Sequence, residues 1–205
     1  MPDPKFLYLT HPEWVQTWVD GGQVPLNLAS SYLSEKRHAT LTPDEAEQRE
    51  LRGISYPDFK QGIHIKPGAN ISVSDVRIRF PDGRIAGGPE VLFTQRQEDG
   101  LILCLSNSFS KETMLRFGKT ACVEIPDCYL LLNSIDKQLK TEGRAGKVEY
   151  TDSLDRNHFL KSKEDQWQDE FRLFWPLLKP EEVRIHAGLA SLKHAGIQNF
   201  PVSDK

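Results

Sequence analysis

A glutamate and an arginine stand two residues apart in a segment whose pattern changes abruptly. A charged stretch gives way to alternation there, which places Glu170 and Arg172 on one face of a predicted strand. The opposite face carries Phe171, Leu173 and Trp175. One interpretation is an ion pair on the solvated surface of an edge strand, worth about 0.2 to 1 kcal/mol. The other is a carboxylate held by a cation for chemistry, and the spacing leaves both interpretations open.

Hydroxyl groups and a histidine stand where predicted strands end. The apolar run Leu101–Leu105 predicts a buried central strand, and the polar residues that follow include Ser106 and Ser108. His11 stands between a predicted strand and a predicted helix. These residues are candidate ligand contacts, but the serines could equally solvate the end of a strand, and His11 could cap a helix.

The common catalytic and metal-binding motifs are absent from the sequence. The patterns G-x-G-x-x-G, G-x-x-x-x-G-K-[ST], H-E-x-x-H and G-x-S-x-G do not occur, and the six histidines show no metal-ligand spacing. The three cysteines, Cys104, Cys122 and Cys128, form no C-x-x-C pair, so buried thiols are expected rather than a disulfide or a zinc site. We predict no bound metal.

The periodicity of the chain predicts an α+β fold that would position these residues. Spacing also predicts core positions for the four tryptophans, Trp14, Trp18, Trp167 and Trp175. From 54 to 93, short strands alternate with glycine and proline, with a turn at Pro81–Gly83. Helices are expected over 14–19, 111–117 and 129–140. Strands are expected over 5–9, 24–26, 101–105, 120–125, 147–150, 170–175 and 183–186, of which 183–186 should be the last strand of the chain.

A strong helix start stands between the first strands and the central one. Thr42 and Glu45 have capping-box spacing, and Pro43 occupies the first helical position. We therefore predict a helix from Pro43 to Arg52. Its lack of an apolar stripe would place it on the surface or over an opening, as a lid.

Length and composition predict one folded domain that spans residues 1–205. Hydrophobic residues make up 38% of the chain, which is enough for a core, and the formal charge of −3 excludes a passive coat for a polyanion. No apolar run approaches the roughly 20 residues that span a bilayer, and the start lacks the pattern of a secretory signal. We expect a cytoplasmic protein without a membrane partner.

The order of these features resembles that of ADP-ribosyltransferase-like chains. The segment LKSKEDQWQDEFRLFW resembles the ending of an uncharacterised bacterial family, distantly related to that fold, which carries a K-x-x-W-x-x-E-x-R pattern. GLILCLSNSFSKETMLRFGKTACVEI resembles the middle of the same family, and YLTHPEWVQTWVDGGQVPL is similar in layout to the start of DarT-type DNA ADP-ribosyltransferases. The resemblance implies split mixed or antiparallel sheets with flanking helices.

The resemblance also implies a substrate and a set of roles. NAD would be cleaved at its nicotinamide–ribose bond through a sugar cation, with Glu170 as the catalytic carboxylate. A shift of one residue in strand phase would make Asp169 the candidate instead. The residues expected to hold the nicotinamide and ribose are His11, Ser31 or Tyr32, and Ser106 or Ser108, and those expected to hold the pyrophosphate are Arg37 and Arg172.

The implied activity is NAD-dependent mono-ADP-ribosylation of a macromolecule, either nucleic acid or protein. A bacterial toxin or antiphage effector would suit such an enzyme, with an antitoxin or regulatory partner. Three alternatives stay open at this point: an NAD glycohydrolase, a non-catalytic binding module that keeps the fold, and a protein that binds a partner through the sheet-rich region 54–93.

Overall fold

The structure of this protein is a computed structural model. The structure describes residues 2–33, 41, 83, 99–153 and 156–194 together with the backbone of 47–53, 69–79 and 85–96.

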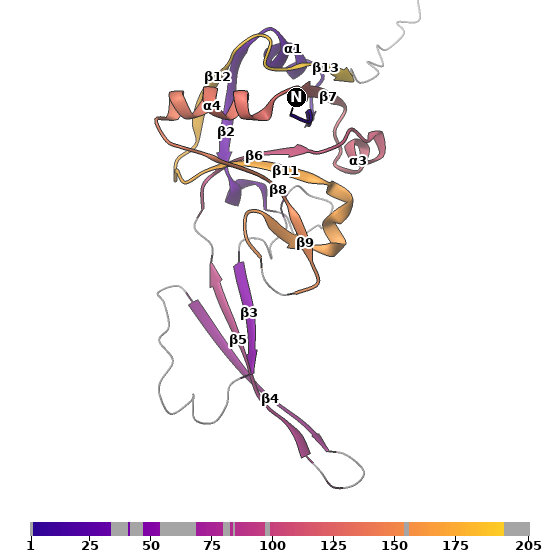
Figure 1. Cartoon of the computed structure of the whole chain (residues 1–205), viewed down its shortest axis with the longest axis vertical. Helices are drawn as coiled ribbons and strands as arrows, with labels where there is room; N and C mark the ends of the chain where they lie inside the picture. The colour runs from indigo at the N-terminus through magenta and orange to yellow at the C-terminus, as the bar shows by residue number, and fades with distance from the viewer. Residues whose placement is uncertain are drawn as a thin grey trace, which may run out of the picture.

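An eight-stranded sheet forms the body of the molecule (Figure 1). Its strands follow the order β12-β2-β6-β1-β7-β13, and β11 pairs with both β6 and β8. Every pairing within this sheet is antiparallel. The strands are β1 (Lys5–Leu9), β2 (Gly22–Leu28), β6 (Leu101–Ser106), β7 (Ala121–Ile125), β8 (Arg144–Lys147), β11 (Glu170–Trp175), β12 (Glu181–Ile185) and β13 (Ser191–His194).

Strand β6 is central, as its continuous apolar run predicted. Along one edge it pairs with β11 over its whole length, from Leu101 opposite Trp175 to Ser106 opposite Glu170. Two strands share its other edge: β2 pairs at Leu101 and Ile102, while β1 pairs at Ser106. Because β1 and β2 contact opposite ends of β6, the sheet parts between them.

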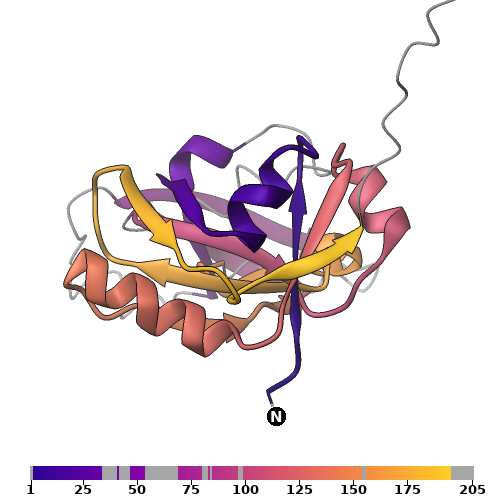
Figure 2. The same ribbon diagram turned by 90° about the horizontal axis from the view of Figure 1, so that it is seen from above.

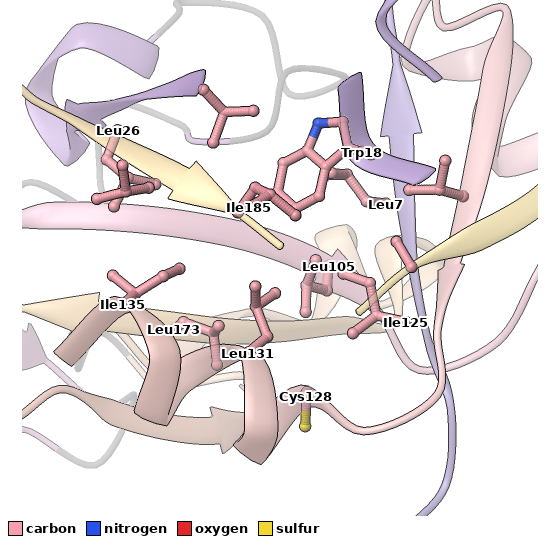
Figure 3. Packing of buried hydrophobic residues seen from close by; sticks show 14 of the residues in the cluster. Leu7, Trp18, Leu26, Leu105, Ile125, Cys128, Leu131, Ile135, Leu173 and Ile185 are labelled. Atoms are coloured by element: carbon pink, nitrogen blue, oxygen red, sulfur yellow. The ribbon is translucent and has the colours of Figure 1, made fainter. Parts of the chain in front are cut away.

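The core lies between the sheet and two of its helices, α1 (Trp14–Val19) and α4 (Cys128–Leu139). Helix α4 lies alongside β12 (Figure 2). In Figure 3, Leu131 and Ile135 point from α4 toward Leu105 and Leu173 of the sheet, and Trp18 enters from α1. Burial of one such leucine or isoleucine stabilises the fold by roughly 1.5 to 3 kcal/mol.

The other described helices are short. Helix α3 (Lys111–Arg116) begins at Ser110, whose hydroxyl accepts a hydrogen bond from the backbone N–H of Thr113. Two 3₁₀ helices, η1 (Ala29–Tyr32) and η3 (Lys163–Gln168), follow β2 and precede β11. The small parallel pair β9 (Glu149–Thr151) and β10 (Leu160–Ser162) packs beside η3.

A separate three-stranded antiparallel sheet extends away from the body (Figure 1). It consists of β3 (Glu47–Gly53), β5 (Ile85–Arg96) and β4 (Ala69–Arg79), in that order. The predicted helix from Pro43 to Arg52, with its role as a lid, is therefore wrong over 47–52, where the chain pairs with β5. The start of that helix, Pro43 and its capping residues, lies outside the described residues.

The α+β class is confirmed, with sheets that are mostly antiparallel and few helices. The expected strands at 5–9, 101–105, 120–125 and 170–175 are present, as are the expected helices at 14–19, 111–117 and 129–140. The strand expected at 183–186 corresponds to β12 but is not the last of the chain, because β13 follows it and pairs with β7. Of the tryptophans, Trp18 and Trp175 are buried as predicted, but Trp14 is 47% exposed.

Candidate functional site

A cleft of about 550 Å³ opens where β1 and β2 part from one another on β6. This volume suits a ligand of the size of a nucleotide or a cofactor. Aliphatic, aromatic and short polar side chains line it, together with one lysine. The lining residues are Leu7, Tyr8, Leu9, Thr10, Trp14, Thr17, Trp18, Gln23, Val24, Pro25, Asn27, Tyr32, Ile102, Leu103, Cys104 and Lys119.

A small cavity of about 40 Å³ adjoins this cleft. The two share Tyr8, Cys104 and Lys119 as lining residues, so the small cavity, which we call the inner cavity, lies beside the cleft. Ser106 and Glu170 line it as well. Its volume is enough for a water molecule or a hydroxyl group, but not for a ring.

Glu170 begins β11 and is buried, with 2% of its surface exposed. Its Oε2 accepts hydrogen bonds from Nε of Arg172 at 2.9 Å and from Nη2 at 2.5 Å. Nζ of Lys161 lies 3.7 Å from the same oxygen. The other carboxylate oxygen, Oε1, is buried without a hydrogen-bond partner among the described residues. Such an oxygen costs the folded state about 1 to 3 kcal/mol, so it is expected to meet a donor in the functional state.

The surroundings of Glu170 hold its carboxylate in place. Nη1 of Arg172 donates to the carbonyl of His158 at 2.8 Å, and Nζ of Lys161 donates to Oε1 of Gln168 at 2.5 Å. The backbone N–H of Glu170 donates to the hydroxyl of Tyr150. Burial raises the pKa of that tyrosine, which keeps its hydroxyl protonated. The interpretation of Glu170 and Arg172 as a solvated ion pair on an edge strand is therefore wrong, since β11 has neighbours on both edges and the pair is buried.

The phase of β11 is the one that the alternation predicted. Phe171, Leu173 and Trp175 belong to the main core, and the carboxylate of Glu170 lies on the opposite face with Arg172. Asp169 precedes the strand with a left-handed φ of 44°. Its carboxylate accepts hydrogen bonds from the side chains of Asn107 and Ser108.

The two predicted serines lie close to Glu170 but are engaged by the protein. Ser106 is buried opposite Glu170 in the ladder, and its hydroxyl donates to the carbonyl of Gln168 at 3.2 Å. Ser108 is exposed, and its hydroxyl donates to Oδ2 of Asp169 at 2.7 Å. Of the two, only Ser106 lines the inner cavity.

The remaining predicted residues are dispersed. Tyr32 lines the cleft, where its hydroxyl accepts a hydrogen bond from Nδ2 of Asn27 at 3.1 Å. The hydroxyl of Ser31 donates to the carbonyl of Leu28 within the 3₁₀ turn, and Ser31 does not line the cleft. His11 stands at the strand–helix junction as predicted, but it is exposed and does not line the cleft. The centroid of its ring lies 4.6 Å from the ring centroid of Trp14. Arg37 lies outside the described residues.

Sequence reasoning missed Tyr8 and Lys119, which line both the cleft and the inner cavity. The hydroxyl of Tyr8 donates to the carbonyl of Ser108 at 3.2 Å and accepts from the N–H of Ser110 at 2.8 Å. Burial raises the pKa of Tyr8 and lowers the pKa of Lys119. The alternation in β1 could have indicated Tyr8, since its neighbours Leu7 and Leu9 face the core.

The cleft offers a lysine and aromatic side chains, and the cavity beside it offers a carboxylate. The part of the chain that the structure describes contains no group of three or more histidine, cysteine, aspartate or glutamate side chains able to hold a metal ion. The family pattern also fits incompletely, because Lys163 precedes Trp167 by four positions where the pattern has three.

Comparison with protein-family models, curated proteins and solved structures found no match to this chain. Within the described residues, no helix is both long and apolar enough to cross a membrane.

Proposed function

We propose that this protein cleaves NAD at the nicotinamide–ribose bond and transfers ADP-ribose to a macromolecule, on an ADP-ribosyltransferase-like fold. The observation that carries the proposal is the buried carboxylate of Glu170, which lines a small cavity beside an open cleft and whose Oε1 has no hydrogen-bond partner among the described residues. Such a carboxylate, with its other oxygen fixed by Arg172, suits the stabilisation of positive charge that develops on a sugar ring.

The cleft supports the same proposal through its size and its lining. Trp14 and Tyr32 give it exposed aromatic surfaces on which a planar base could stack. The inner cavity is large enough for a ribose hydroxyl, which could donate to Oε1 of Glu170. The cleft where β1 and β2 part on β6 adjoins the cavity that Glu170 lines, so a ligand in the cleft would lie near this carboxylate.

The proposal is tested by incubating the purified protein with adenine-labelled NAD, with and without cell lysate, nucleic acids or protein. Wild type is compared with Glu170→Gln and with Glu149→Gln, a matched change at an exposed glutamate. We expect Glu170→Gln to lose about a hundredfold to a thousandfold in rate while NAD still raises its melting temperature, because the carboxylate acts mainly in the transition state.

The products separate the alternatives. Label on one macromolecular fraction, made by wild type and by Glu149→Gln, supports the transferase and identifies the acceptor class. Free ADP-ribose alone identifies a glycohydrolase, in which water replaces the acceptor. Unchanged NAD under every condition contradicts the proposal and favours a binding module, and full activity in Glu170→Gln contradicts the role of that residue.

A further inference from the structure

Lys119 is the only lysine, arginine, aspartate, glutamate or histidine among the described residues that line the cleft. It lies just after Gly118, in the turn between α3 and β7, and its side chain is half-buried. The described residues of the cleft wall therefore carry one positive charge and no acidic side chain.

The protein does little to compensate this charge. The one polar partner of Nζ among the described residues is the hydroxyl of Thr10, at 2.8 Å, which is uncharged. Glu170 lines the same inner cavity, but no ion pair joins it to Lys119, and its Oε2 is held by Arg172 and Lys161. Burial lowers the pKa of Lys119, which is the sign of a cation short of favourable interactions.

An anion bound beside Nζ would supply the missing interaction. Because Lys119 lines both the cleft and the inner cavity, an anion beside its Nζ would share the cleft with Trp14 and Tyr32 and would adjoin the cavity that Glu170 lines. A ligand that carries a planar base at one end, a sugar at the other end and a phosphate between the two would match this order of aromatic surface, cation and carboxylate.

We propose that Lys119 binds the phosphate of a nucleotide ligand in the cleft, most simply a pyrophosphate. The identity of the ligand rests on the proposed function, whereas the anion site rests on the geometry of Lys119 alone. This assignment gives the pyrophosphate a cation in the cleft itself, whereas the predicted Arg172 is buried on Glu170.

The test is calorimetric titration with adenosine, ADP and inorganic pyrophosphate at fixed ionic strength. Wild type is compared with Lys119→Met, with Lys119→Arg, which keeps the charge, and with Lys137→Met, which removes an exposed charge on α4. We expect wild type to bind ADP at least tenfold more tightly than adenosine, and Lys119→Met to lose about tenfold to a hundredfold in ADP affinity with adenosine affinity unchanged. Lys119→Arg should recover part of the loss, and Lys137→Met should match wild type.

Equal affinity of wild type for adenosine and ADP would overturn the inference, as would equal losses for both ligands in Lys119→Met. The outcome is separable from the NAD assay. If wild type consumes NAD and Lys119→Met does so with the same KM, the anion site is wrong and the function stands. If NAD is untouched while ADP or pyrophosphate binds in a manner that depends on Lys119, the function is wrong and the anion site stands.

Discussion

Replacement of Arg172 by methionine should destabilise the protein by about 3 kcal/mol. Arg172 is fully buried, and among the described residues it makes three short hydrogen bonds, two to Oε2 of Glu170 and one to the carbonyl of His158. Removal of one partner from a buried ion pair costs about 3 to 5 kcal/mol, because the other charge is left uncompensated. Here Nζ of Lys161, 3.7 Å from the same oxygen, compensates part of the loss, so the lower end of that range is expected.

The assay is urea unfolding at pH 7, with free energies compared only between variants that share the same m-value. The matched control is Lys193→Met, which removes a lysine paired with Glu124 at 2.9 Å in a partly exposed position. That change should cost less than about 1 kcal/mol. The double variant Glu170→Gln/Arg172→Met should show a coupling of about 1 to 3 kcal/mol. A loss of unfolding free energy below about 1 kcal/mol for Arg172→Met would refute the argument that Arg172 and Glu170 form a desolvated ion pair, and so would the absence of coupling between the two substitutions.

Two further predictions concern local features. Asp127→Ala should lower the unfolding free energy by about 1 kcal/mol, because Oδ1 of Asp127 caps α4 through the N–H groups of Tyr129 and Leu130; an unchanged urea midpoint would contradict the cap. Burial raises the pKa of Cys122 to about 12, so iodoacetamide at pH 8 should label Cys104 in the cleft and spare Cys122 in the native protein; mass spectrometry that finds equal labelling would contradict the burial.

The sequence predicted the elements whose side chains face one core. The predictions of strand β6 and helix α4 were correct because burial leaves a pattern in each sequence segment. The pattern is a continuous apolar run in β6 and a helical repeat of apolar residues in α4, and both can be recognised without knowledge of the neighbouring elements. The predicted helix from Pro43 to Arg52 is wrong over 47–52 for the opposite reason. Its evidence was a local capping signal, and the ladder between β3 and β5 overrode that signal with partners about 40 residues away.

The candidate site was only partly predictable, because the cleft is a product of strand order. Glu170 and Arg172 could be placed on one face from alternation, but their burial depends on β6 and β8, which lie on either side of β11. Lys119 follows a glycine in a polar turn and has the sequence context of a surface lysine. Only the parting of β1 and β2 on β6 makes it part of a cleft.

The polar residues after β6 contribute to the site in a way that differs from their predicted role as ligand contacts. The side-chain amide of Asn107 donates to the carbonyl of Asp169 at 3.0 Å and to the carbonyl of Glu170 at 3.0 Å, and Ser108 donates to the Asp169 carboxylate. These bonds hold Asp169 in its left-handed conformation, outside the strand. Since a shift of one residue would reverse every side chain of β11, the end of β6 fixes which of the two adjacent acids reaches the inner cavity. The contact of Ser108 with a ligand stays a prediction. Its hydrogen bond to Asp169 already means that the segment 106–108 helps to position Glu170.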